Sequence, residues 1–149
     1  MMANSTAQQE RKIGKMSILI GHASIAEDGS INGKAGDQTK KEVCTRSWYS
    51  KPWNVMLICT DEALAKKAAQ EMRYACSNDK VGYGQKDRRS AYNSAIVNGN
   101  TFKNAKGNTD CSQLVASCYI LAGLKKLSPD CYTGNLRKAL LATGKFKEY

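Results

Sequence analysis

A cysteine stands at the start of an expected helix, in the segment Thr109-Asp110-Cys111-Ser112-Gln113. Asp110 has the residue type of an N-cap, and Gln113, three residues later, is its expected capping-box partner. An apolar pattern continues to residue 122, and the glycine at 123 ends the helix. Free backbone N–H groups and the helix dipole at such an N-terminus favour the thiolate of Cys111. The sequence therefore predicts a nucleophilic thiol.

The chain has one histidine, His22, in an otherwise apolar segment. A thiolate that attacks a carbonyl needs a base or imidazolium partner and donors for the oxyanion, for which the backbone N–H of Cys111 is a natural choice. Taken alone, a histidine in this setting is more often a hydrogen-bonded core residue. The capped cysteine shifts the interpretation toward a Cys111–His22 pair, with His22 as the base.

A third polar group must hold the imidazole in the reactive tautomer. The candidates follow a predicted turn at residues 27–30 and are Asn32, Asp37 and Gln38. Simple hairpin counting places residues 32–35 opposite His22 and favours Asn32, whereas bulges at the intervening glycines would bring Asp37 or Gln38 forward. We favour Gln38, because an amide accepts the imidazole N–H without adding a charge.

The elements that must position these residues are strands first and helices second. We expect strands at residues 16–26, 42–48 and 54–59 in one small antiparallel sheet. Helices are expected after an N-cap at Thr60, at 86–97, from Cys111, and from about 133 or 135 to 144, with loops at 78–85 and 98–108. The buried stripe of the first helix is predicted to be Leu64, Ala68, Met72 and Ala75. This order predicts an α+β fold.

Length and composition narrow the classes further. The 149 residues, 42% hydrophobic and 24% charged, fit a soluble globular protein, with residues 1–15 a flexible tail and 16–149 a single catalytic domain. Apolar runs are too short to span a bilayer, and the N-terminus lacks the apolar region of a secretory signal. We therefore expect a protein made in a cytoplasm, with no membrane insertion and six reduced cysteines. One histidine and no CxxC pair argue against zinc, so we expect no metal.

The chain has 23 Lys and Arg residues and 13 Asp and Glu residues, which gives a net charge of +10. Such a surface attracts polyanions, including nucleic acid, anionic lipid and the anionic polymers of a bacterial envelope. The basic residues are scattered, aromatic residues make up only 7%, and no nucleic-acid motif is present, which counts against a nucleic-acid-binding module.

Residues 110–115, DCSQLV, resemble the D-C-S-x-L-V nucleophile motif of NlpC-type, papain-like cell-wall peptidases. Residues 21–31, GHASIAEDGSI, resemble the histidine hairpin of that family, and residues 82–85, GYGQ, its aromatic-glycine segment that lines the site. In the usual family the cysteine helix precedes the histidine strand; here His22 comes first. The resemblance is therefore to a circularly permuted papain-like fold. The pattern over residues 16–146 is also similar to small phage lysins, or endolysins.

This resemblance implies a cysteine peptidase that hydrolyses amide bonds of peptidoglycan through a thioacyl-enzyme, without a cofactor. Cys111 would be the nucleophile and His22 the base. Tyr83 would line the cleft or donate to the oxyanion, or is alternatively a packed tyrosine. Asp110 is favoured as a helix cap, and Ser112 is grouped with the supporting residues. The basic surface would bind anionic wall polymers, and a signal-free lysin would need a holin-like route to the wall.

Two alternatives remain open. One keeps the fold but makes the protein an amidase, acyltransferase or deamidase acting on protein or lipid. The other is a non-enzymatic basic module that binds nucleic acid, with Cys111 buried and inert; it predicts salt-sensitive binding and no fast-reacting thiol.

Overall fold

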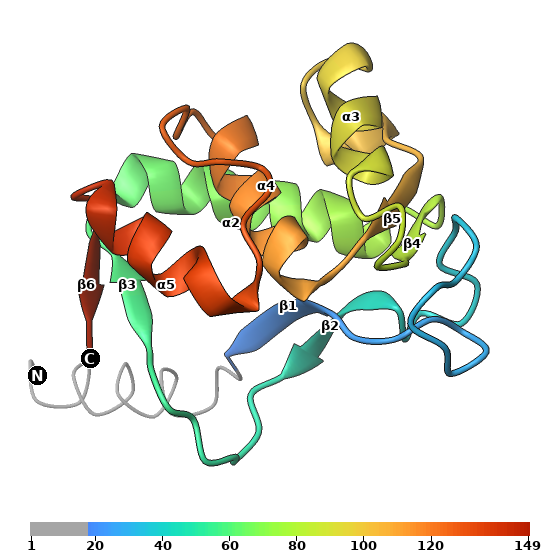
Figure 1. Ribbon diagram of the computed structural model, residues 1–149, viewed down its shortest axis with the longest axis horizontal. Helices are drawn as coiled ribbons and strands as arrows, with labels where there is room; N and C mark the ends of the chain where they lie inside the picture. Colours follow the sequence, from blue (N-terminus) through green and yellow to red (C-terminus); the bar gives the residue numbers. More distant parts are fainter. Residues whose placement is uncertain (1–17) are drawn as a thin grey trace, which may run out of the picture.

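The computed structural model describes residues 18–149, so the expected flexible tail at residues 1–15 lies outside the described residues (Figure 1). Three strands come first in this part of the chain, and helices interspersed with short strands follow, which is compatible with the predicted α+β class. In chain order the elements are β1 (Leu19–Ala23), β2 (Val43–Ser47), β3 (Leu57–Cys59), α2 (Glu62–Ser77), β4 (Val81–Tyr83), α3 (Ser90–Val97), a 3₁₀ helix (Phe102–Asn104), β5 (Gly107–Thr109), α4 (Cys111–Leu121), α5 (Thr133–Ala142) and β6 (Phe146–Glu148).

The strands form three separate pairs, and the prediction of one antiparallel sheet from the first three strands is wrong. β1 pairs with β2 and β3 pairs with β6, both antiparallel, whereas β4 and β5 are parallel. Figure 1 shows β3 and β6 side by side at one end of the molecule, near the C-terminus. β4 and β5 lie in segments expected to be loops. Each has three residues, too few for an alternating pattern to stand out.

The helices are close to their predicted positions, with shifts at their starts. The N-cap of α2 is Asp61, whose side chain accepts from the Leu64 backbone N at 3.1 Å, so the assignment of the cap to Thr60 is wrong. Thr60 Oγ1 instead donates to the Lys145 carbonyl oxygen at 3.1 Å. Of the predicted stripe of α2, Met72 is only partly buried, and the other three positions are buried.

Two clusters of buried side chains form the core, and α4 belongs to both. Leu114 and Cys118 of α4 pack into the first cluster with Phe102, while Ala116 packs into the second with Leu140 and others. α2 packs along α4, and α5 contacts α4 through the second cluster. Burial on both sides fixes the direction of α4 and therefore the position of its first residue.

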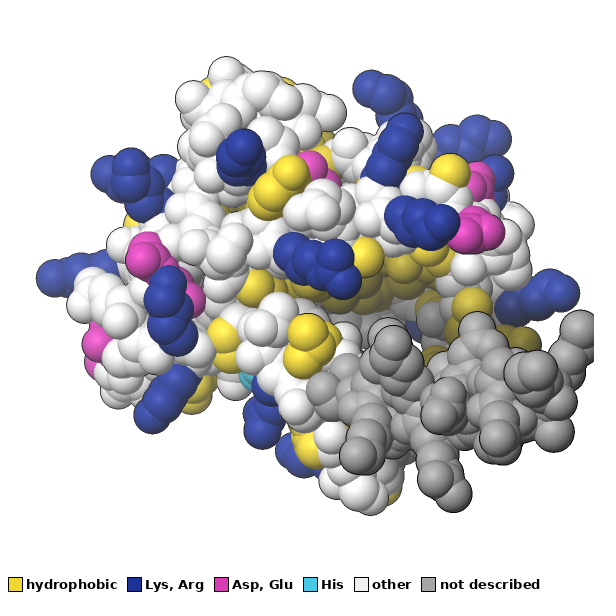
Figure 2. Space-filling model, turned by 180° about the vertical axis from the view of Figure 1, so that it is seen from behind, with side chains coloured by type: hydrophobic (Ala, Val, Ile, Leu, Met, Phe, Trp, Pro, Cys, Tyr) yellow, Lys and Arg dark blue, Asp and Glu magenta, His cyan; other side chains and the backbone are white. Residues whose placement is uncertain are grey.

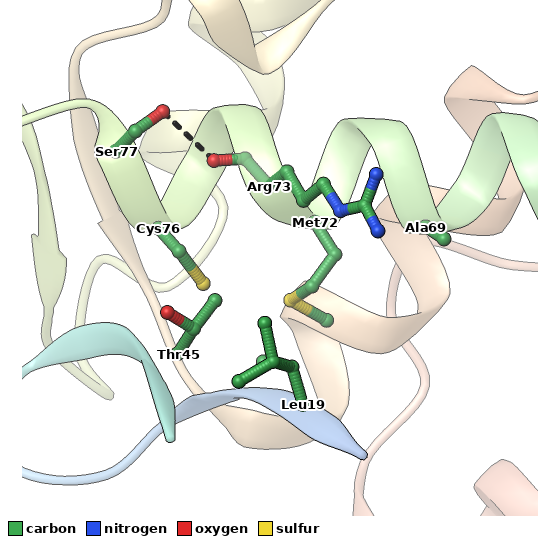
Figure 3. Close-up of a pocket in the computed structure, with 8 residues that line it drawn as sticks. Leu19, Thr45, Ala69, Met72, Arg73, Cys76 and Ser77 are labelled. Carbon is green, nitrogen blue, oxygen red and sulfur yellow. Dashed lines mark hydrogen bonds between the residues drawn. The ribbon is translucent and has the colours of Figure 1, made fainter. Parts of the chain in front are cut away.

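The β1–β2 pair lies against the helices rather than apart from them. β1 contacts both α2 and α4, and Figure 1 shows the two strands beneath these helices. Between the strands and α2 is a hollow of about 410 Å³. Leu19 and Thr45 approach it from the strands, and Met72 and Cys76 from α2 (Figure 3). The strand that carries His22 thus packs against α2 and α4.

Candidate active site

The N-terminus of α4 is capped as the sequence predicted. Asp110 Oδ1 accepts hydrogen bonds from the Gln113 backbone N at 2.9 Å and from Ser112 Oγ at 3.3 Å. The Gln113 side chain does not complete a capping box, because its Nε2 donates to Ser117 Oγ at 3.2 Å within the buried face of the helix. Ser112 is itself buried, so its hydroxyl supports the cap.

All six cysteines are free, and Cys111 is exposed whereas the other five are half-buried or buried. Within α4 the other residues are likewise half-buried or buried. Cys111 Sγ lies 3.8 Å from Thr133 Oγ1, at the start of α5. As first residues of the helix, Cys111 and Ser112 have backbone N–H groups with no hydrogen-bond partner among residues 18–149. The site therefore combines an accessible thiol with free amide donors beside it.

Four of the other five thiols are held in their neutral form by burial. Burial raises the pKa of Cys76 to about 12 and the pKa of Cys118 well above its ordinary value. It also raises the pKa of the Cys44 and Cys131 thiols. These four side chains are poor nucleophiles near neutral pH, because the thiolate is the reactive form.

An apolar groove of about 320 Å³ opens beside Cys111. It runs between α4, α5 and the chain that leads into β3. Four of its lining residues carry a thiol, hydroxyl or guanidinium group: Cys111, Ser112, Thr133 and Arg137. The other lining residues are apolar: Val55, Leu57, Val115, Leu136 and Leu140. A substrate chain laid in this groove would pass the thiol.

Arg88 is a site residue that the sequence analysis missed. Its Nη1 donates to Asp110 Oδ2 at 2.9 Å and to Ser112 Oγ at 3.4 Å. Its Nη2 donates to the carbonyl oxygens of Cys131 at 2.7 Å and Asp130 at 3.0 Å. In the sequence Arg88 is one of several scattered basic residues, and nothing local marks it as the link between the α4 cap and the segment before α5.

His22 is half-buried on β1, and the partner of its imidazole is not the one expected. The β1–β2 register sets His22 opposite Cys44, and His22 Nε2 lies 3.4 Å from Cys44 Sγ. Burial, together with the positive charge of Arg46, lowers the pKa of His22. Within residues 18–149 no hydrogen bond joins His22 to Cys111. The two residues lie on elements that contact each other, β1 and α4.

The hairpin count that favoured Asn32 opposite His22 is wrong. Asn32 forms a bridge with Gly84, and its Oδ1 accepts from the Lys86 backbone N at 3.1 Å. The chain between β1 and β2 is a long loop, held by the Glu42 carboxylate, which accepts from the Glu27 backbone N at 2.5 Å and from the Tyr83 backbone N at 2.9 Å. A loop closed by distant side chains cannot be counted as a tight turn.

The two other candidates for the third residue lie in different environments. Gln38 is exposed beside a shallow hollow that Glu27 and Lys34 also line, and no hydrogen bond joins it to His22 in the described part of the chain. Asp37 is 1% exposed, and its carboxylate faces the backbone N–H groups of Lys40, Lys41 and Glu42, although none of these contacts within residues 18–149 has full hydrogen-bond geometry. Burial raises the pKa of Asp37.

Tyr83 is buried in β4, and its hydroxyl accepts from Gln85 Nε2 at 3.0 Å. This geometry matches the packed-tyrosine alternative. The strand that carries Tyr83 pairs with β5, which runs directly into Asp110 and Cys111. The aromatic-glycine segment therefore supports the strand that delivers the cysteine to its position.

Residues 20–149 match the family described as endolysin-like domain. The chain belongs to the endolysin-like domain family. No curated protein and no solved structure matches the chain significantly. Membership of this family indicates a phage cell-wall lytic function, with bacterial peptidoglycan as the material on which an endolysin-like domain acts.

Several features of this endolysin-like domain bear on its setting. Among its described residues no helix is long and apolar enough to cross a membrane. Nor does the described part of the chain bring three or more His, Cys, Asp or Glu side chains together in a way that could hold a metal ion. Figure 2 shows lysine and arginine side chains spread over one face, with hydrophobic side chains gathered in a hollow across its middle.

Proposed function

We propose that this endolysin-like domain is a cysteine peptidase that hydrolyses amide bonds of bacterial peptidoglycan, with Cys111 as nucleophile and His22 as base. The observation that carries the proposal is the placement of Cys111. It is an exposed thiol at the capped N-terminus of α4, at the edge of an apolar groove, in a chain whose other described thiols are half-buried or buried. The NlpC-like motif and the permuted papain-like fold belong to the same proposal.

The chemistry follows from the groups at the site. The proton of the Cys111 thiol passes to His22, the resulting thiolate attacks the carbonyl carbon of the scissile amide, and the free backbone N–H groups of Cys111 and Ser112 stabilise the oxyanion. The His22 imidazolium protonates the leaving amine, which leaves a thioacyl-enzyme on Cys111. Neutral His22 then takes a proton from water as the hydroxide attacks the thioester, the acid product leaves with expulsion of the Cys111 thiolate, and His22 returns its proton to the sulfur. No cofactor takes part.

The proposal requires that substrate binding bring Cys111 and His22 together, and the elements that carry them, α4 and β1, are in contact. Catalytic hydrogen bonds are often long or misaligned without substrate and shorten in the complex. A peptide in the groove between α4 and α5 would bury Cys111 and provide that constraint.

The charge of the protein supports the same target. A net charge of +10 attracts the anionic polymers of a bacterial wall and raises the local concentration of the enzyme there. The basic side chains are spread over the surface, as Figure 2 shows for one face, which fits attraction to an extended polyanion. We propose that the protein acts on the wall after release from the host cytoplasm through a holin-like route.

The first experiment measures lysis of purified cell walls by wild type and Cys111→Ala. We expect Cys111→Ala to lose lysis, with Cys59→Ala, a half-buried strand cysteine, as the matched control that retains it. Iodoacetamide labelling followed by peptide mass spectrometry should modify Cys111 before the other five cysteines, and His22→Ala should change the pH dependence of that labelling. Lysis at the wild-type rate by Cys111→Ala would overturn the proposal.

A further inference from the structure

The imidazole of the single histidine has one side-chain partner in the described structure, the Cys44 thiol. The strand register places Cys44 directly opposite His22, and Cys44 Sγ lies 3.4 Å from His22 Nε2. Directly opposite residues on paired strands have their Cβ atoms about 4.5–5.5 Å apart, so this contact is built into the β1–β2 pair. It does not depend on the conformation of a loop.

A second contact of Cys44 Sγ determines which atom donates in the hydrogen bond between His22 and Cys44. Cys44 Sγ lies 3.7 Å from the backbone carbonyl oxygen of Lys41, which can only accept a hydrogen bond. A thiol has one proton. When that proton points to the Lys41 oxygen, the sulfur lone pairs face the ring, and His22 Nε2 must carry the hydrogen that it donates to sulfur. The chain of donors is then Nε2–H to sulfur, and S–H to the carbonyl oxygen.

We propose that Cys44 is the positioning residue of the site: it accepts a hydrogen bond from His22 Nε2–H and so leaves Nδ1 unprotonated and free to take the proton of Cys111. This inference rests on the proposed function, which makes Cys111 the residue that gives its proton to His22. It assigns to Cys44 the role of the third group, for which Asn32, Asp37 and Gln38 were the candidates from sequence.

The surroundings of Cys44 suit this role rather than nucleophilic attack. Burial and the nearby Asp37 carboxylate raise the pKa of the Cys44 thiol, so it stays neutral near pH 7. A neutral thiol can accept from Nε2 and donate to Lys41 at the same time, whereas a thiolate would lose the second contact. The charge of the Asp37 carboxylate, which is 1% exposed, therefore helps to keep Cys44 protonated against the opposing charge of Arg46.

Nuclear magnetic resonance of the full chain tests the assignment directly, because a protein with one histidine gives one imidazole ¹⁵N pattern. In wild type at neutral pH we expect the pattern of a ring protonated at Nε2, with an Nε2–H resonance protected from exchange with water. Cys44→Ala should lose that protected proton, and Cys44→Ser, whose hydroxyl can accept, should recover part of it. Cys59→Ala is the matched control and should leave the pattern unchanged.

Wall lysis by the same variants gives the second readout. Cys44→Ala should lower kcat at least tenfold with KM nearly unchanged, because Cys44 does not line the groove beside Cys111, and Cys44→Ser should recover part of kcat. A wild-type ring protonated at Nδ1, an unchanged imidazole pattern in Cys44→Ala, or labelling of Cys44 by iodoacetamide ahead of Cys111 would each overturn the role of Cys44. Continued lysis by Cys111→Ala would instead overturn the proposed function, and the imidazole pattern would still report on Cys44.

Discussion

The Arg88 guanidinium lies 2.9 Å from Asp110 Oδ2 and 2.7 Å from the Cys131 carbonyl oxygen, so one side chain joins the cap of α4 to the segment that leads into α5. Cys111 follows Asp110, and Thr133 follows the Cys131 segment. The two edges of the site are therefore tied together through Arg88. The side chains of Arg88 and Asp110 are 20% and 12% exposed, which makes this the most buried ion pair of the described residues.

Replacing Arg88 by Met should lower the free energy of unfolding by about 3 kcal/mol, because it leaves a largely buried carboxylate and two carbonyl oxygens without their donor. Urea unfolding monitored by circular dichroism measures this loss. Arg89→Met is the matched control: Arg89 pairs with Asp130 at 2.7 Å on the surface, so its loss should cost about 1 kcal/mol or less. Equal losses in the two variants would contradict the role given to Arg88.

Asp37→Asn should stabilise the protein near neutral pH, because burial of the Asp37 carboxylate outweighs its contacts with Lys40 and the backbone N–H groups of residues 40–42, and an amide of the same shape removes that buried charge. Burial raises the folded-state pKa of Asp37, so its carboxyl contributes most to stability at pH values below its unfolded pKa, and that contribution is lost as pH rises through the folded pKa.

The stabilising effect of Asp37→Asn should therefore shrink as the pH falls below the ordinary aspartate range. Urea unfolding of wild type and variant across a pH series measures the difference. Asp28→Asn is a suitable control, because the side chain of Asp28 is exposed and accepts from the Ser30 backbone N in a local turn. An Asp37→Asn protein that is less stable than wild type at neutral pH would show that the carboxylate has a partner when charged.

His22 should make folding stability depend on pH between neutral and acid conditions. Its folded-state pKa is lowered by burial and by Arg46, so below the ordinary value of 6.5 the unfolded chain binds a proton more readily than the folded one. The contribution of neutral His22 is therefore complete above that value and is lost as pH falls through the folded pKa. Relative to His22→Gln, wild type should lose stability as the pH falls below about 6.5 and through the folded-state pKa. A constant difference over that range would contradict this.

Local signals in the sequence were sufficient for α4 and for most of α2. The Asp110 cap, the exposed Cys111 and the stripe from Leu64 to Ala75 depend on neighbours within one or two helical turns, and the structure has them. The β3–β6 pair was not predictable in this way, because Cys59 and Phe146 meet only after the helices between them have packed.

The site shows the same division between local and long-range information. The position of Cys111 follows from its own helix, whereas the partner of His22 depends on a register that the long loop after β1 determines. Glu42 holds that loop through the backbone N atoms of Glu27 and Tyr83, a contact between three distant segments. Residue counting could not have shown that Cys44 would face the imidazole.

Gly21 precedes His22 and has no room for a side chain: a Cβ there would overlap the Met72 side chain of α2 and touch Cys76 Sγ. Gly21→Ala should therefore destabilise the protein by about 1–3 kcal/mol through overpacking, while Met72→Ala alone should cost about 2 kcal/mol through the space it leaves. In the double variant the new methyl group enters that space. The two losses should then be less than additive, by at least about 0.5 kcal/mol.

Urea unfolding of the four proteins measures this coupling between β1 and α2. Gly29→Ala provides the matched control, because Gly29 has a φ of +79° in the turn after β1 and a Cβ there would meet nothing within 4 Å. That variant should lose about 1 kcal/mol to backbone strain and show no coupling to Met72→Ala. Additive losses for Gly21 and Met72 would mean that β1 yields instead of Met72. In that case Gly21→Ala would also displace His22, and lysis by Gly21→Ala would fall even where the protein remains folded.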